Sequence, residues 1–168
     1  MFGGSVHTLI LDDPTATEAL GRALAACLGA GSFVALRGDL GAGKTALARG
    51  VARGLGVEGP VPSPTYTLVA RYEGLTAPLT HADWYRLSDV DELEQLGWDE
   101  LVEGGGVVMV EWPDRVPSAL PADRLDVSLR DLPQREGREA RLQPTGPAHR
   151  ARLAALTLDH PGIHRVPQ

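Results

Sequence analysis

The chain has 168 residues, of which 43% are hydrophobic and 23% charged, and these values are ordinary for one globular domain. Its formal net charge is −6, so it lacks the positive charge expected of a protein that binds nucleic acid on its own. A single cysteine, Cys27, excludes an intrachain disulfide framework.

The N-terminal segment has no basic region followed by a long apolar run, so we expect no secretory signal. No apolar stretch approaches the length of a membrane span either. We therefore expect a cytoplasmic protein with no membrane partner.

The first half of the chain alternates between strand and helix patterns. Weak alternation over 5–13 predicts an edge strand. A capping Asp, a following Pro and a closing Gly predict a helix over Asp13–Gly31. The apolar run Ser32–Arg37 predicts a short buried strand, and Lys44–Leu55 a second helix. The Pro-rich segment 57–67 predicts a loop.

The second half predicts shorter elements: strands over 67–74 and 79–85, a helix over 88–98 with Ser88 and Asp91 at capping-box spacing, strands over 104–112, 125–131 and 138–143, and a helix over 147–158. This order predicts an α/β fold, with a mostly parallel central sheet flanked by helices and an antiparallel edge from the last two strands. We expect one domain over 1–158 and a disordered tail over 159–168.

Between the strand Ser32–Arg37 and the next helix lies the pattern G-x-x-x-x-G-K-S/T, filled by Gly38, Gly43, Lys44 and Thr45. In such a phosphate-binding loop (P-loop), glycines turn backbone N–H groups inward, the helix dipole favours an anion, and the lysine reaches the β- and γ-phosphates. The threonine hydroxyl binds Mg²⁺. The predicted nucleotide-binding residues are Gly38, Asp39, Leu40, Gly41, Ala42, Gly43, Lys44, Thr45 and Ala46. We therefore predict a P-loop NTPase.

Lys44 is the only lysine among the 16 basic residues. A general preference for arginine explains the other positions but not this exception. A phosphate loop explains it, because a compact ammonium fits that geometry and a wide guanidinium does not.

A P-loop enzyme also needs an acid at the end of a neighbouring strand, close to Mg²⁺. Asp83 and Glu111 both end predicted strands, where ligands bind in open α/β sheets. Thr65 and Thr67 lie in the loop where switch segments occur and offer hydroxyls to Mg²⁺ or the γ-phosphate. The five histidines show no metal-ligand spacing, and we expect His81, near Asp83, to be a satisfied strand-end histidine.

The chain contains no asparagine. It therefore cannot contain the Asn-Lys-x-Asp element that reads guanine in many GTPases, and the cofactors predicted are ATP and Mg²⁺.

Five motifs occur in an order and spacing that resemble the bacterial TsaE (YjeE) family: GDLGAGKT, SPTYTLV, HADWYRL, VEWPDR and GREAR. The resemblance covers roughly residues 8–145. It implies a P-loop α/β fold and an ATPase that is slow alone. It also implies action with the TsaB–TsaD pair, which transfers a threonylcarbamoyl group to adenosine 37 of tRNAs reading ANN codons. ATP use would reset that pair between turnovers, and tRNA would be met only through these partners.

The resemblance also assigns residues. It implies Thr45 and Glu111 as metal-associated groups, Asp83 as an acid that orients water, and Thr65 as the switch-like threonine. Gly137 and Arg138 match a late motif near the nucleotide edge, where Arg138 would contact phosphate or a partner, or pair with a surface acid. Trp112 follows the acid, as in the family. With Lys44, the predicted catalytic residues are Asp83, Glu111 and Thr65.

Two other functions use the same loop. A small-molecule kinase would use the arginines of 130–141 as a lid over phosphates, but the sequence shows no separate motif for an acceptor. A nucleotide-gated binding module would use slow hydrolysis as a timer, and its partner affinity would differ between ATP and ADP.

Overall fold

The computed structural model describes residues 5–167; the predictions for 1–4 and 168 lie outside this range. In chain order its elements are β1 His7–Leu11, α1 Pro14–Cys27, β2 Ser32–Arg37, α2 Lys44–Gly54, β3 Val69–Tyr72, β4 Leu79–Asp83, α3 Val90–Gln95, α4 Trp98–Glu103, β5 Val107–Glu111, the 3₁₀ turns η1 Pro113–Arg115 and η2 Pro117–Ala119, β6 Leu125–Asp131, β7 Arg138–Pro144, α5 Pro147–Ala154 and β8 Ile163–Arg165. In these residues no helix has the length and apolar character needed to cross a membrane.

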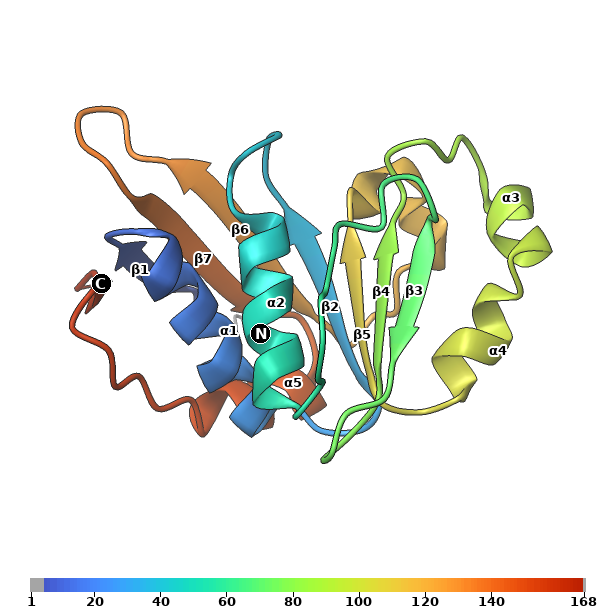
Figure 1. Ribbon diagram of the computed structural model, residues 1–168, viewed down its shortest axis with the longest axis horizontal. Helices are drawn as coiled ribbons and strands as arrows, with labels where there is room; N and C mark the ends of the chain where they lie inside the picture. Colours follow the sequence, from blue (N-terminus) through green and yellow to red (C-terminus); the bar gives the residue numbers. More distant parts are fainter. Residues whose placement is uncertain (1–4, 168) are drawn as a thin grey trace.

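The strands form one mixed sheet in the order β3-β4-β5-β2-β6-β7-β1-β8 (Figure 1). Four adjacent strands, β4, β5, β2 and β6, run parallel, whereas β3 at one end and β7, β1 and β8 at the other pair antiparallel. The α/β class is confirmed. The prediction of a mostly parallel sheet is wrong, because three of the seven strand pairings are parallel and four are antiparallel. The predicted strands β6 and β7 do pair antiparallel, but they do not form the edge, because β1 and β8 lie beyond them.

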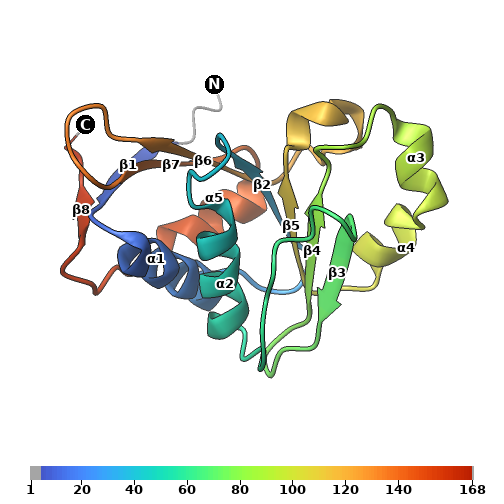
Figure 2. The same cartoon turned by 45° about the horizontal axis from the view of Figure 1, so that its top comes forward.

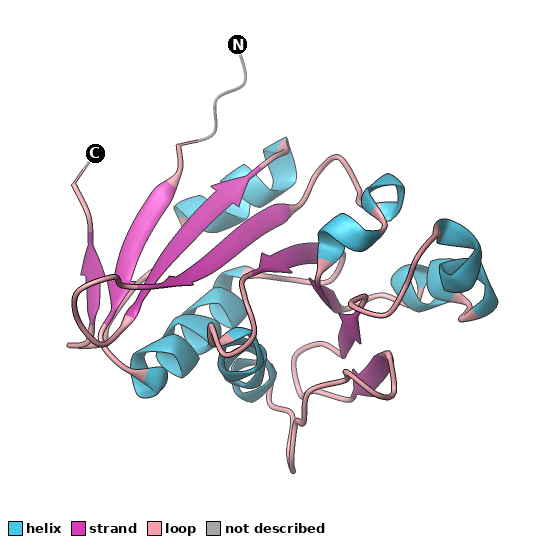
Figure 3. Ribbon diagram, turned by 90° about the horizontal axis from the view of Figure 1, so that it is seen from above, coloured by secondary structure: helices cyan, strands magenta, loops and turns pink. Residues whose placement is uncertain are grey.

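Helices cover both faces of this sheet (Figure 3). Alternate residues of a strand point to opposite faces. In β2, Val34 and Leu36 join the cluster formed by α1 and α2, whereas Phe33 and Ala35 join the cluster that includes α3 and α4. Figure 2 shows α1 and α2 side by side, with α3 and α4 at the far end of the molecule beyond β3 and β4. The central strands are buried because both of their faces are covered.

Helices α1 and α2 approach each other through glycines. A Cβ built on Gly50 of α2 would lie 2.1 Å from the Glu18 carbonyl oxygen of α1, and one on Gly21 of α1 would lie 2.4 Å from the Leu47 carbonyl oxygen. Backbone atoms cannot move aside as the end of a side chain can. The glycines therefore set the distance between α2, which begins at the phosphate loop, and α1.

Replacing Gly50 with alanine is expected to lower the free energy of unfolding by about 1–3 kcal/mol, the usual cost of overpacking, or more if the helices must separate. Urea denaturation measures the effect. The matched control is Gly29→Ala, where a Cβ meets no atom within 4 Å. A Gly50→Ala protein as stable as the Gly29→Ala control would show that the helix contact is not tight.

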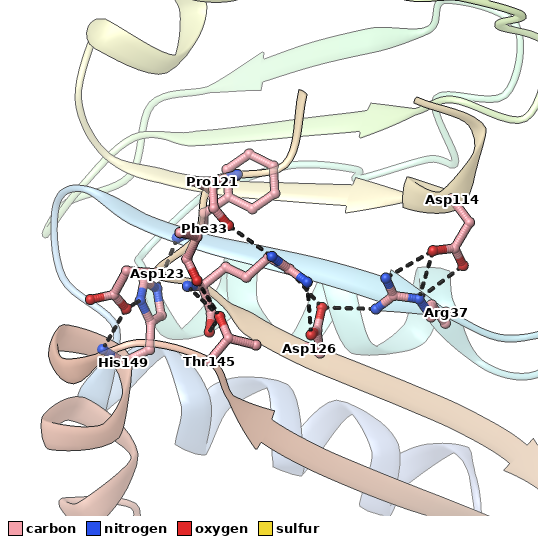
Figure 4. Close-up of polar contacts among 10 residues, drawn as sticks. Phe33, Arg37, Asp114, Pro121, Asp123, Asp126, Thr145 and His149 are labelled. Atoms are coloured by element: carbon pink, nitrogen blue, oxygen red, sulfur yellow. Dashed lines mark hydrogen bonds and ion pairs between the residues drawn. The ribbon is translucent and has the colours of Figure 1, made fainter. Parts of the chain in front are cut away.

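A polar network fixes the end of β2, where the phosphate loop begins (Figure 4). The Arg37 guanidinium donates to Asp114 of η1 and to Asp126 of β6, with N···O distances of 2.9 and 2.8 Å. The hydrogen bonds that Arg37 donates to Asp114, and then to Asp126, hold the pKa of Arg37 above its usual range. At the other end of β2, the buried His149 of α5 accepts from the Phe33 N–H and contacts Asp123. Both ends of β2 are thus tied to neighbouring elements.

Several local predictions differ from the structure. The helix predicted over Asp13–Gly31 ends at Cys27, and the helix predicted over 147–158 ends at Ala154. The segment 88–98, predicted to be one helix, contains α3 and the start of α4, which are separated by Gly97 at φ 70°. The N-cap of α3 is Asp89, whose side chain accepts from the Glu92 N–H, and not the predicted Ser88. The predicted edge strand β1 lies inside the sheet, between β7 and β8. The tail that we expected to be disordered contains β8, which pairs antiparallel with β1. A His164–Asp12 contact of 2.8 Å accompanies this pairing.

Candidate functional site

The predicted phosphate loop joins β2 to α2 at the carboxyl end of the parallel strands (Figure 1). Gly41 and Gly43 have φ values of 79° and 104°, in the region that favours glycine. No side chain caps the N-terminus of α2, and the first N–H groups of a helix have no acceptor within it. The loop therefore presents free backbone donors and the positive end of a helix dipole to an anion.

Lys44 closes this loop. Its ammonium donates to the carbonyls of Gly38 and Asp39 at 2.5 and 2.8 Å and lies 4.7 Å from the centroid of the Trp112 ring. The residue is only 6% exposed. Burial lowers its pKa, and the charges of Glu111 and Asp83 oppose the shift. A phosphate bound to the loop would pair directly with the Lys44 ammonium.

The two predicted acids lie side by side. Asp83 ends β4 and Glu111 ends β5, and they are register partners in the parallel β4–β5 pair. Both are 3% exposed. Buried carboxylates next to a lysine and a free helix N-terminus are suited to hold a divalent cation beside a phosphate.

Each acid has its own hydrogen-bond partners. Asp83 accepts from the Thr65 hydroxyl at 3.1 Å and from the Tyr85 N–H at 2.8 Å. Glu111 lies 2.9 Å from Nε2 of His81, which is fully buried. The loop that carries Thr65 is thereby connected to the strand-end acids.

The predicted nucleotide and catalytic residues meet in one cavity of about 410 Å³, lined by Leu40, Gly41, Gly43, Lys44, Thr45, Ala46, Ser63, Thr65, Asp83, Tyr85, Glu111 and Trp112. Gly38, Asp39 and Ala42 do not line it. Gly38 and Asp39 instead accept the Lys44 hydrogen bonds, and Ala42 is buried. Thr67, the other threonine predicted to offer a hydroxyl, is exposed and does not line the cavity.

A second cavity of about 410 Å³ lies on the other side of the loop, lined by Asp12, Asp13, Pro14, Thr17, Gly41, Gly43, Ala46, Glu136, Gly137 and Arg138. Gly41, Gly43 and Ala46 line both cavities. The Arg138 guanidinium donates to the carbonyls of Gly41 and Ala42 and pairs with Asp131. Arg138 therefore supports the loop from outside.

The sequence predicted His81 to be a satisfied histidine near Asp83, and this is only partly right. Its Nε2 contacts Glu111 and not Asp83, and among residues 5–167 its buried Nδ1 has no hydrogen-bond partner. The two-residue spacing from Asp83 places His81 on the same face of β4. Only the pairing of β4 with β5 brings it to Glu111. Sequence reasoning missed the cavity residues Ser63 and Tyr85, although each lies two positions from a predicted site residue.

Two residues at the edge of the site have strained backbones. Trp112 and Leu68 have φ values of 57° and 66°, and neither is glycine. Such conformations are costly and cluster at functional sites. Trp112 directly follows Glu111, and its ring packs against Tyr85 at a tilt of 57° with centroids 5.0 Å apart. The Leu68 carbonyl accepts from the Asp83 N–H. Both strained residues therefore border the acids.

Comparison with known proteins places this site in a family. Residues 11–140 match the family described as "Threonylcarbamoyl adenosine biosynthesis protein TsaE". The chain is 42% identical over 118 residues to the tRNA threonylcarbamoyladenosine biosynthesis protein TsaE of Bacillus subtilis, covering 70% of this chain and 73% of that protein. It is 47% identical over 113 residues to the protein of the same name from Streptomyces coelicolor, covering 66% and 76%.

A solved structure agrees with these sequence matches. The crystal structure of Bacillus subtilis YdiB superposes with a TM-score of 0.79 at 31% identity, covering 90% of this chain and 94% of that one. The matched sequence range includes the phosphate loop, both acids and Arg138. The chain belongs to the TsaE family.

Proposed function

We propose that this protein binds Mg²⁺ and ATP at the phosphate loop, hydrolyses ATP slowly, and serves threonylcarbamoyl modification of adenosine 37 in tRNAs reading ANN codons. Its partners in this proposal are the TsaB and TsaD proteins, in the cytoplasm, and tRNA is reached through them. The observation that carries the proposal is the meeting of Lys44, Thr45, Asp83 and Glu111 in one cavity. The names of the relatives support the pathway.

The side chains present fit a magnesium nucleotide. Within residues 5–167 no group of three or more His, Cys, Asp or Glu side chains could hold a metal ion by itself. Mg²⁺ in nucleotide sites takes one or two protein oxygens and completes its shell with phosphate oxygens and water. Thr45 and Glu111 would supply those protein oxygens, and the bound ion would neutralise charge on the phosphates.

The chain's own groups have separate tasks in the reaction. The loop N–H groups and Lys44 would hold the phosphates and stabilise the charge that develops as the γ-phosphoryl group leaves. Asp83 is already held by Thr65 and would orient the attacking water. Because Thr65 lies in the loop before β3, a change in that loop would alter the position of Asp83.

The arginines of 130–141 argue against the kinase alternative. Each has an acidic partner: Arg130 and Arg141 contact Glu139, Arg135 contacts Asp12, and Arg138 contacts Asp131. Arginines in a lid that closes over phosphates would need to leave these partners. The observed contacts therefore favour an ATPase over a small-molecule kinase.

Steady-state ATP hydrolysis by the purified protein, alone and with a purified TsaB–TsaD pair, tests the proposal. We expect a slow basal rate that changes when the pair is added. A rate that the pair leaves unchanged would contradict the assigned partners and direct attention to small phosphate acceptors.

The contact between His81 and Glu111 leads to a separate prediction. Because Nε2 faces a carboxylate, it carries the proton and orients Glu111. In metal sites, loss of such an orienting partner costs about 10–100-fold in metal affinity or activity. We expect His81→Ala to raise the Mg²⁺ concentration for half-maximal hydrolysis by about that factor.

His149→Ala is the matched control, because it removes another buried histidine paired with a carboxylate, at the opposite end of β2. It should lower the melting temperature and leave the Mg²⁺ requirement unchanged. Equal effects of the two variants on the Mg²⁺ requirement would show that His81 acts only through stability.

A further inference from the structure

A groove lies on the sheet face opposite α1 and α2, away from the phosphate loop. It has a volume of about 390 Å³ and runs between α3 and α4 on one side and η2 with the following residues on the other. Its apolar lining comes from Phe33, Val90, Leu93, Trp98, Val102, Ala119, Leu120 and Pro121. Phe33, Leu93 and Trp98 form the floor and are at most 4% exposed. At its margin, Val90 is 39% exposed. The groove thus offers an apolar floor that nothing in the described part of the chain fills.

The helices beside the groove carry a concentrated negative charge. Residues 89–103 contain seven carboxylates and no Lys, Arg or His: Asp89, Asp91, Glu92, Glu94, Asp99, Glu100 and Glu103. The other residues of the chain contain 15 acids and 16 basic residues. The net charge of the protein therefore comes from this one segment.

These seven carboxylates differ from the other acids of the chain in how often a basic side chain lies beside them. In residues 5–167, which include every Asp and Glu, none of the seven lies within 4 Å of an Arg, Lys or His nitrogen, whereas nine of the other 15 do. Glu94, Asp99 and Glu103 line the groove itself. Like charges that lack cationic partners repel one another, and a cation placed among them would relieve that repulsion.

We propose that this groove docks an amphipathic helix of a partner protein, with apolar side chains on the groove floor and Lys or Arg side chains facing Glu94, Asp99 and Glu103. Helices bind grooves of this kind through one apolar face. The surrounding negative charge repels nucleic acid and anionic membranes, which leaves a basic protein segment as the complementary occupant. The proposal rests on the proposed function and adds to it the surface that contacts the partner.

The groove floor is connected to the candidate nucleotide site. The Trp98 ring packs edge-on against Trp84 with centroids 5.2 Å apart. Trp84 directly follows Asp83, and the backbone N–H of Trp84 donates to the Glu111 carbonyl at 3.0 Å. A helix seated on Trp98 would therefore press on the segment that holds both acids, so docking is expected to change the rate of ATP hydrolysis.

The test compares two triple variants with the same change in charge. The groove variant is Glu94→Lys, Asp99→Lys and Glu103→Lys. The control is Glu58→Lys, Glu73→Lys and Asp159→Lys, at three exposed acids outside the groove. Basal ATP hydrolysis and melting temperature check that both variants fold. Affinity for the purified TsaB–TsaD pair is measured by calorimetry at low and physiological salt.

A second arm uses a labelled synthetic helix with leucines on one face and lysines on the other, and a counterpart in which glutamates replace the lysines. It does not depend on TsaB–TsaD.

We expect the groove variant to lose on the order of tenfold or more in affinity for the pair and for the lysine helix, with basal hydrolysis unchanged. The control should bind as the parent does. If the parent binds the pair and the groove variant binds it equally well, the groove proposal is overturned while the proposed function stands. If the parent does not bind the pair, the assigned partner is wrong, and the peptide arm decides: equal binding of the lysine helix by parent and groove variant overturns the groove.

Discussion

The Lys44→Ala protein is expected to lose at least about 10²–10³-fold in kcat for ATP hydrolysis, the size seen when one group that stabilises transition-state charge is removed. Lys44 is the only lysine, it is 6% exposed, and its ammonium lies between the loop carbonyls and the Trp112 ring. Among the residues that the structure describes, no other basic side chain lines the cavity. A phosphate assay under saturating Mg²⁺ and ATP measures the loss.

Arg53→Ala is the control for this prediction. Arg53 lies on the same helix, but its guanidinium donates to the Val57 carbonyl at the far end of α2. It should keep the parental rate. Because Lys44 also bonds to its own loop, melting curves of both variants must be recorded. A folded Lys44→Ala protein with an undiminished rate would refute the phosphate-loop assignment.

Removing the Glu111 carboxylate is expected to have the second large effect. Glu111 is buried beside Asp83 and contacts His81, and its removal leaves Asp83 as the only acid among the described residues that line the cavity. Glu111→Ala should lower Mg²⁺-dependent turnover on the order of 10²-fold, more than Trp112→Ala does. The ring of Trp112 contacts Lys44 but offers no oxygen to a metal. Mg²⁺ titrations of the hydrolysis rate rank the variants.

Glu111→Gln separates charge from shape, since it keeps the size of the side chain and an oxygen for His81. If charge at the metal matters, this variant should lose nearly as much as Glu111→Ala. A larger loss in Trp112→Ala than in Glu111→Ala would mean that the metal site is misplaced.

Local chemistry made much of this site predictable from sequence. The loop between β2 and α2 needs glycines at positive φ, and its lysine and threonine follow at fixed spacing. Asp83 and Glu111 were found because each ends an apolar strand, and parallel strands bring their carboxyl ends to one edge. The start of α1 was also predictable, because Asp13 caps the helix by accepting from the Ala16 N–H.

What sequence reasoning missed depends on contacts between distant segments. The position of β1 between β7 and β8 joins residues more than 100 positions apart, and no local pattern encodes such a pairing. His81 meets Glu111 only through the β4–β5 register. Arg138 supports the loop because β7 brings it there, across 96 residues. Gly97 separates α3 from α4, but the helical pattern on both sides of this glycine predicted one continuous helix.

The most direct test of the central claim is the number of tRNAs modified at adenosine 37 per TsaB–TsaD pair, measured with excess tRNA and threonylcarbamoyl donor. Reactions would contain this protein with ATP, with a non-hydrolysable ATP analogue, or as Lys44→Ala. We predict several modified tRNAs per pair only with the parental protein and ATP, and about one or fewer otherwise. Repeated turnover that is equal in all reactions would contradict a role for this ATP site in the modification.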